Sequence, residues 1–168
     1  QGDTAPKTPG AQHQFVYRSD NKPFTQAQLV FDHVTQVMGL QPFRAEVCLY
    51  SQKLRCAGQA DALFRDASGR IVVWDWKRIK TLRNDNRYAQ LRYPLGHLDD
   101  CNWSLYSLQL NTYAWFLESE CGMTVSDLLL FLVHPDRASP EIVRVPFLRA
   151  EIALLVDYEV EQGRAGAS

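Results

Sequence analysis

Two aspartates and a lysine have the types and spacing that could do chemistry. The run Gly58-Gln59-Ala60-Asp61 is followed, after thirteen intervening residues, by Asp75-Trp76-Lys77. Side chains repeat every two residues along a strand, so Asp75 and Lys77 are expected on one face of a strand. An acid and a base at the end of an otherwise apolar strand are costly unless something uses them. The pattern therefore indicates a polar functional site.

The turn at residues 66–69 is expected to join this strand to the one before it. The sequence Asp66-Ala67-Ser68-Gly69 is typical of a hairpin, and folding back there brings Asp61 near the end of the 70–76 strand. Two carboxylates and a backbone carbonyl form a hard-oxygen site suited to Mg²⁺ or Mn²⁺. A metal lowers the pKa of a bound water, and a nearby lysine can offset charge that develops on a phosphorane. The chemistry implied is phosphodiester hydrolysis.

Periodicity predicts the elements that position these residues. A helix capped by Thr25 should run to Met38 and end at Gly39. Asn102 or Ser104 should cap a second helix that ends near Glu120. The other predicted elements are strands 44–50, 54–64, 70–76, 128–134 and 141–145 and a last helix over 148–161. The class is α/β, in the order α-β-β-β-α-β-β-α.

At this point the chain resembles a known group of enzymes. Asp61…Asp75-x-Lys77 after a helix, with Gly58 before the first aspartate, is similar to the PD-(D/E)XK nuclease superfamily. Its restriction-endonuclease-like core runs α-β-β-β-α-β, which matches residues 25–134 and leaves an extra strand and a C-terminal helix. Gln109-x-x-x-Tyr113 resembles the motif of the RecB-like group. The wider run 100–118 looks like nuclease-like domains of large DNA viruses and microbial eukaryotes.

The resemblance implies a role for each matching residue. Asp61 and Asp75 would be metal ligands, with the Trp76 carbonyl as a further ligand and Lys77 as the catalytic lysine. Gln109 and Tyr113 would orient the lysine or contact DNA. The implied activity is Mg²⁺- or Mn²⁺-dependent hydrolysis of DNA by an exonuclease or by a flap- or end-acting nuclease, on single-stranded or end-containing DNA.

The chain departs from that pattern upstream of the core. RecB-type nucleases carry an upstream helix with a further His or Glu ligand, and no Gly-Thr-x-x-His run precedes the core here. His33 or Glu46 could substitute. If Cys48 pairs with Cys56, however, Glu46 lies opposite Gly58 and on the other face from Asp61, unless a β-bulge intervenes. Glu46 is thus a metal ligand or an ordinary carboxylate. The group's iron–sulfur members need three cysteines after the core, and none follows Cys121, so we expect no such cluster.

A basic segment follows the catalytic strand. Residues 77–92 contain six lysines and arginines but only one acid, Asp85. Tyr88 lies among these residues, and Tyr93 directly follows them. A charge run is usually a solvated face, but a phosphate backbone has to enter at this point and tyrosines can stack on bases. We therefore favour DNA binding. The residues expected to bind DNA here are Arg78, Lys80, Arg83, Arg87 and Tyr88, and Tyr113 is added by the resemblance.

Composition sets the wider limits. The 168 residues suit one domain, expected at 24–162 between a linker or N-terminal arm at 1–23 and a flexible tail at 163–168. The 46% apolar content excludes a disordered chain, and a net charge of −1 excludes a globally basic coat. The longest apolar run, 128–133, is too short to span a membrane, and no secretory signal opens the chain.

These features predict an intracellular protein of a reducing compartment, the cytoplasm or the nucleus, with no membrane partner. The four cysteines are expected to be reduced and buried. The first residue is Gln1, so we expect an excerpt of a longer parent chain that carries further domains.

Three rival interpretations stay open. Asp75 and Lys77 could form a surface ion pair worth at most about 1 kcal/mol. The whole could be a degenerate nuclease fold kept as a nucleic-acid-binding or protein-assembly module. It could also be a metal-dependent phosphoesterase that acts on other substrates.

Overall fold

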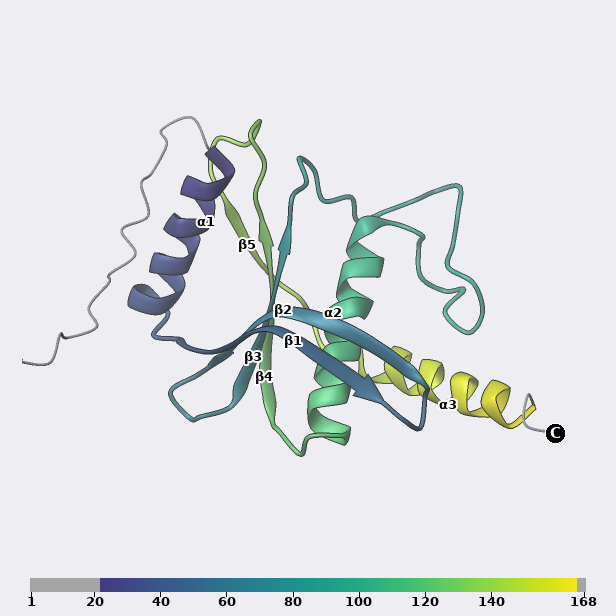
Figure 1. The fold of residues 1–168 in the computed structure, drawn as a ribbon. Coiled ribbons are helices and arrows are strands. Elements are labelled where there is room, and N and C mark those ends of the chain that lie inside the picture. The colour runs from purple at the N-terminus through teal and green to yellow at the C-terminus, as the bar shows by residue number, and fades with distance from the viewer. Residues whose placement is uncertain (1–21, 166–168) are drawn as a thin grey trace, which may run out of the picture.

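The computed structural model describes residues 22–165, which form one five-stranded sheet with helices on both faces (Figure 1). The strand order is β1-β2-β3-β4-β5, and every neighbouring pair is antiparallel except the parallel pair β3 and β4. The elements are α1 (Lys22–Asp32), a π-helical turn η1 (His33–Val37), β1 (Gln41–Ser51), β2 (Cys56–Arg65), β3 (Ile71–Lys77), α2 (Asn102–Ser119), β4 (Val125–Leu132), β5 (Glu141–Arg144) and α3 (Arg149–Ala165). The mixed α/β class and the order of the elements are those expected from the sequence.

The ends of three helices differ from the expected boundaries. Helix α1 begins at Lys22, so the end of the predicted arm is helical, and residues 1–21 lie outside the described residues. Helix α3 runs through residues 163–165 of the predicted tail, and residues 166–168 are not described. The N-cap of α2 is Cys101, whose extended backbone (φ −140°, ψ 165°) precedes a helical Asn102. Within the described part of the chain, no helix has the length and hydrophobicity to cross a membrane.

The central strand β3 is apolar on both faces because helices cover both. Ile71 and Val73 pack beneath α2, in a cluster with Leu110 and Phe116. Val72 and Trp74 face α1 and pack with Val30, Val34, Phe64 and Phe131. The parallel neighbour β4 accounts for this continuous apolar run, since parallel strands are usually buried on both faces. Alternation then leaves Asp75 and Lys77 on the α2 face, as the sequence predicts.

The register between β1 and β2 differs from the one expected. Ser51 pairs with Cys56, so the turn comprises residues 52–55, and Cys48 lies opposite Gln59 rather than Cys56. All four cysteines are free, and only Cys101 is buried, so the expectation of buried thiols is wrong for the other three. Glu46 lies between the paired residues Ala45–Ala62 and Val47–Ala60, so the observed register places it opposite Asp61.

The hairpin between β2 and β3 is closed as predicted. The Asp66 carboxylate accepts hydrogen bonds from the backbone amides of Ser68 (2.8 Å) and Arg70 (3.0 Å), and Gly69 supplies the positive φ of 77°. Ladder pairing runs from Arg65–Ile71 to Ala62–Trp74. The same register, continued by one residue, would place Asp61 of β2 opposite Asp75 of β3.

Candidate active site

Lys77 stands at the end of β3 and is held from three sides. Its ammonium donates a hydrogen bond to Gln109 Oε1 (2.9 Å), forms an ion pair with Asp75 Oδ2, and lies 4.7 Å from the centre of the Tyr106 ring. Its side chain is only 16% exposed. A lysine tail normally moves freely, so three contacts to one ammonium fix a charge in a defined place.

Gln109 is in turn held by the next turn of α2. Its Nε2 donates a hydrogen bond to the Tyr113 hydroxyl (2.8 Å), as side chains four residues apart on a helix can do. Tyr113 is 6% exposed, and it lies against Gly58, where a Cβ would come within 2.6 Å of the ring. The expected DNA contact by Tyr113 is therefore not supported, because the side chain is buried. Its hydroxyl instead contacts Gln109, which binds Lys77, and the expected role in orienting the lysine stays a prediction.

Asp61 is fixed to the neighbouring strand by a backbone contact. Its Oδ2 accepts a hydrogen bond from the Trp76 amide at 2.7 Å. The Trp76 ring points to the opposite face, where it packs against Trp74 and Phe131 at centroid distances of 4.9 and 5.3 Å. The contact between Trp76 and Asp61 is therefore made by the Trp76 backbone, not by its ring.

Asp75 is the buried carboxylate of the pair, with 2% of its surface exposed. Burial raises its pKa, the Lys77 ammonium lowers it and the charge of Asp61 raises it, and the net pKa lies above the ordinary value. Its Oδ2 atom is in contact with the Lys77 ammonium, and beyond that ammonium it has no hydrogen-bond donor among the described residues. The structure thus brings both aspartates and the lysine to one end of β3.

The chemistry of this donor set fits a hard divalent cation. Asp61 and Asp75 supply carboxylate oxygens, and beyond Lys77 the buried Asp75 Oδ2 has no hydrogen-bond donor among the described residues. Among residues 22–165 no three His, Cys, Asp or Glu side chains form a group that could hold a metal by themselves. Mg²⁺ is usually bound through one or two carboxylates and keeps several waters, so two aspartates are enough for it.

The proposed third ligands do not join this group. Glu46 lies across the ladder from Asp61 with a φ of 52°, but it is exposed and accepts a hydrogen bond from Gln59 Nε2. The turn between β1 and β2 is longer than predicted, so Glu46 lies opposite Asp61 and not opposite Gly58. The Glu46 side chain is nevertheless directed to Gln59. His33 is exposed in η1, and the helix before it covers the opposite face of the sheet.

The basic segment keeps most of its side chains in solvent. Arg78, Arg83 and Arg87 are exposed, and Tyr88 is 98% exposed. Two of the cations have acidic neighbours, since Lys80 pairs with Asp136 (3.3 Å) and Arg87 lies 4.0 Å from Asp85. A hollow of about 450 Å³ beside the start of α2 is lined by Arg83, Asp85, Asn86, Arg87, Tyr88, Asp100, Cys101 and Asn102.

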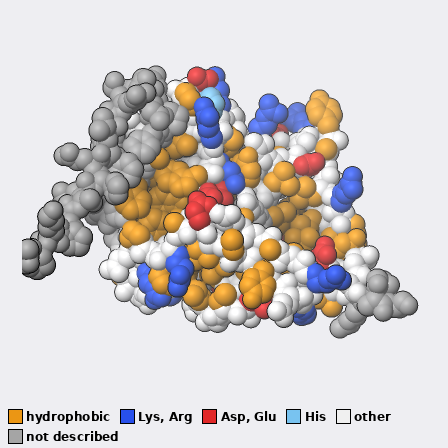
Figure 2. All heavy atoms as spheres, in the orientation of Figure 1, with side chains coloured by type: hydrophobic (Ala, Val, Ile, Leu, Met, Phe, Trp, Pro, Cys, Tyr) orange, Lys and Arg blue, Asp and Glu red, His pale blue; other side chains and the backbone are white. Residues whose placement is uncertain are grey.

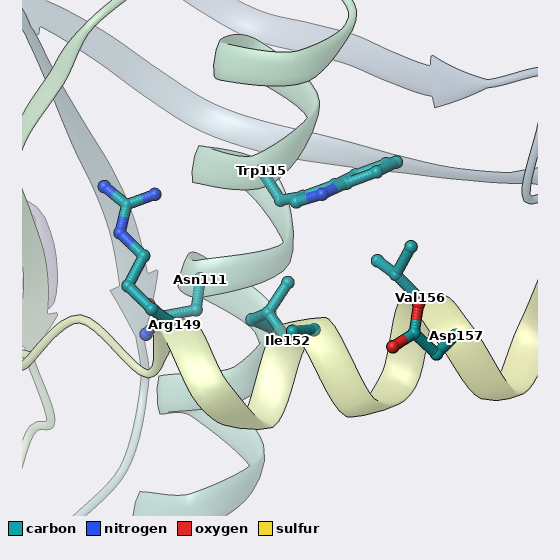
Figure 3. A pocket seen from close by; sticks show the side chains of 7 residues that line it. Asn111, Trp115, Arg149, Ile152, Val156 and Asp157 are labelled. Carbon is teal, nitrogen blue, oxygen red and sulfur yellow. The ribbon is translucent and has the colours of Figure 1, made fainter.

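A second, narrower hollow lies between α2 and α3, away from these residues (Figure 3). It measures about 200 Å³, and Trp115 and Val156 face each other across it. Its remaining lining is Asn111, Arg149, Ile152, Ala153 and Asp157. Neither this hollow nor the polar hollow is lined by Asp61, Asp75 or Lys77, so neither one marks the site at the end of β3.

From the sequence alone, Tyr106 has no role in the site, and there is no physical reason for a glycine at position 58. The spacing of Tyr106, Gln109 and Tyr113 places all three on one face of α2, which is a signal that the sequence does contain. The close approach of Gly58 to the Tyr113 ring joins β2 to α2 across a long sequence separation. No local pattern shows that contact.

Comparison with known proteins adds little beyond this geometry. No family model matches the chain, and no curated protein does. Among solved structures, SSO0001 is similar over 83% of this chain and 58% of its own, with 18% identity and a TM-score of 0.39. The "Putative exonuclease" from Eubacterium rectale is similar over 83% and 52%, with 14% identity and a TM-score of 0.47. The chain spans just over half the length of both, and neither likeness assigns an activity to it.

Proposed function

We propose that this chain is a nuclease domain of the RecB-like PD-(D/E)XK type that hydrolyses DNA at ends or single-stranded flaps with the help of Mg²⁺ or Mn²⁺. One observation carries the proposal. A buried aspartate, a second aspartate oriented on a backbone amide and an immobilised lysine meet at one strand end. The restriction-endonuclease-like core, with the additional β5 and α3, is part of the proposal.

A purely structural ion pair does not account for Asp75 and Lys77. Surface ion pairs are solvated, whereas Asp75 is 2% exposed and the Lys77 side chain 16% exposed. Burying a charged pair costs desolvation free energy that their attraction repays only with good geometry and further hydrogen bonds. Asp75 Oδ2 lacks such a further bond among the described residues. A buried ion pair with so few further hydrogen bonds is typical of a functional site.

Each residue then has a defined task. Asp61 and Asp75 would hold the dication, with the Trp76 carbonyl as a further oxygen ligand. A bound Mg²⁺ would polarise the phosphate and make a neighbouring water more acidic. Lys77 places its ammonium where negative charge develops on the phosphate. Gln109 and Tyr106 contact that ammonium independently of Asp75, and Tyr113 keeps Gln109 in position.

A second candidate function is a degenerate fold that binds nucleic acid or assembles with proteins without cleaving. The observation in its favour is that, in the described part of the chain, no His, Cys or Glu joins the two aspartates as a third side-chain ligand. A metal-dependent phosphoesterase for other substrates would use the same residues. The exposed arginines and Tyr88 in the segment that follows Lys77 favour a nucleic acid over a small phosphate ester.

Cleavage of labelled single-stranded and duplex DNA with Mg²⁺ or Mn²⁺ tests the proposal. Lys77→Ala should reduce the cleavage rate by about 10²-fold or more, the scale for losing a positioned charge in a transition state. Lys53→Ala removes an exposed lysine in the β1–β2 turn and should leave the rate unchanged. Asp75→Asn should abolish Mn²⁺ binding in a calorimetric titration, because an amide does not replace a carboxylate on a hard dication. If the protein binds DNA but shows no metal-dependent cleavage, the non-catalytic function is the correct one.

A further inference from the structure

Two tyrosines on the segment that joins β3 to α2 are largely exposed. Tyr88 is 98% exposed and Tyr93 78% exposed. Tyrosines carry a large apolar surface and are usually at least partly buried. Two exposed aromatic rings only five residues apart on one segment can mark an interaction site. The question is what these two rings bind.

The segment that carries them is fixed by its own backbone. An isolated bridge joins Gln90 to Asp99, Leu91 N–H donates to the Leu98 carbonyl (2.9 Å) and Asp100 N–H donates to the Ala89 carbonyl (3.0 Å). Asn86 links both sides of this loop, because its backbone amide donates to Asp99 Oδ2 (3.1 Å) and its side chain donates to the Asp100 carbonyl (2.7 Å). A fixed backbone reduces the ordering entropy lost when a ligand binds to the rings.

The same segment is packed against the helices. Leu95 is 3% exposed and forms a small cluster with Leu108 of α2 and Ile152 of α3. The Tyr93 ring meets the edge of Tyr158 from α3 at a centroid distance of 5.5 Å. In Figure 1 this loop extends from the start of α2 on the side of the molecule where α3 lies. The Tyr158 ring therefore supports Tyr93 on one side, and most of the Tyr93 surface stays accessible to solvent.

The charges around the rings suit a phosphate backbone. Arg83, Arg87 and Arg92 are all exposed, and the first two line the hollow beside Tyr88. Of the acids in the segment, Asp85 lies by Arg87 and Asp99 accepts the Asn86 amide, whereas Asp100 is exposed and lines the same hollow. Cations that follow a backbone, together with aromatic rings for successive bases, are the features by which proteins bind single strands.

The segment is also connected to the catalytic lysine. The Trp103 amide in the first turn of α2 donates to the Arg83 carbonyl (3.0 Å). One turn later on the same helix, the Tyr106 ring lies over the Lys77 ammonium. The segment thus begins at the strand that carries Lys77 and ends at the helix that carries Tyr106.

We infer that Tyr88 and Tyr93 form a stacking platform for unpaired nucleotides, so that the substrate of this domain is a single strand rather than a continuous duplex. Bases inside a duplex are stacked on each other and do not present their faces to protein rings, whereas unpaired bases do. This inference rests on the proposed function and specifies its substrate.

Binding measured without cleavage tests it. The anisotropy of a labelled oligothymidylate, an abasic oligomer of the same length and a hairpin duplex would be followed in the presence of a chelator. The variant Tyr88→Ala/Tyr93→Ala should bind the oligothymidylate about tenfold or more weakly, since stacking on one ring contributes at least about fivefold. Its affinity for the abasic oligomer and the duplex should change by no more than about twofold, because their phosphates still meet the same arginines.

Controls separate stacking from general damage. Tyr88→Phe/Tyr93→Phe keeps the rings and should bind the oligothymidylate like the wild type. Tyr50→Ala removes a tyrosine that is 63% exposed on β1 and should have no effect. The single variant Tyr88→Ala, which loses a ring almost wholly in solvent, should show the same selective loss at a smaller scale.

Two outcomes would overturn the inference. One is an unchanged affinity for the oligothymidylate, and the other is an equal loss on all three probes. Either result leaves the cleavage assay to decide the nuclease proposal separately, because the chelator removes catalysis from this measurement. Conversely, a selective loss of single-strand binding supports the platform even if the wild type cleaves nothing.

Discussion

At the residue scale, the two aspartates of the site are held in different ways. Asp61 accepts a hydrogen bond from the Trp76 amide on the neighbouring strand. Asp75 is buried, and its pKa is raised by burial first, against the opposing effect of Lys77. Without a metal, Lys77 is the only cation paired with Asp75 among the described residues. The free energy of this pair is therefore open to measurement in the metal-free protein.

The raised pKa of Asp75 predicts a pH dependence of stability with a definite sign. The folded protein retains the Asp75 proton to a higher pH than the unfolded chain, whose aspartate pKa is about 4. Its contribution to the free energy of unfolding is thus greatest below that pH and is lost as the pH rises through the raised pKa. Urea unfolding with a chelator would measure wild type and Asp75→Asn from acid to neutral pH. The free energy of wild type minus that of the variant should fall across this interval, and a rise would mean that Lys77 outweighs burial.

At the element scale, the strand that carries the site was predictable and its neighbour's register was not. The apolar run of β3 with polar residues at alternate positions of its end indicates a buried strand, which the structure confirms. The Asp66–Gly69 turn chemistry located the β2–β3 hairpin in the same way. The β1–β2 turn has no such signal, and its polar residues fit several lengths. The expected pairing was off by three residues. Glu46 was expected opposite Gly58, and it lies opposite Asp61 instead.

The close packing of β2 against α2 gives a prediction for Gly58. In Gly58→Ala the new Cβ would come within 2.6 Å of Tyr113 Cε1, so the ring has to shift and the hydrogen bond to Gln109 should be lost or distorted. Overpacking of this kind costs about 1–3 kcal/mol of stability. We also expect the cleavage rate to fall by at least about tenfold, because Lys77 loses its support. Thermal unfolding and single-turnover cleavage would measure the two effects.

A second substitution separates packing from catalysis. Gly58→Ala/Tyr113→Leu removes the ring that the new Cβ meets, so it should recover part of the lost stability. It should not recover the rate, because the hydroxyl that holds Gln109 is absent. A double variant that regains full activity would show that Tyr113 has only a packing role.

At the scale of the whole molecule, the candidate site depends on contacts between distant parts of the chain. Lys77 and Gln109 are 32 residues apart, and Gly58 meets Tyr113 from another strand. The sequence indicates each partner but not the contact, since helix placement over a sheet is set by the packing of the core. Charge is also a global property, and the chain carries a net −1. Figure 2 shows side chains of both signs scattered over the visible face, so any DNA binding has to arise from a local cluster.

The last prediction tests whether the segment after β3 is that cluster. In Arg83→Gln/Arg87→Gln, single-strand binding should weaken to a similar extent for all base sequences, because phosphates carry no sequence information. The slope of log affinity against log salt concentration should become shallower by about 1.4, the value for two phosphate contacts on a single strand. Lys53→Gln/Arg55→Gln removes the same charge from the exposed β1–β2 turn, and we expect its slope to equal that of the wild type. If both variants change the slope equally, net charge alone drives binding, and an unchanged slope in the first variant would make these arginines solvated surface.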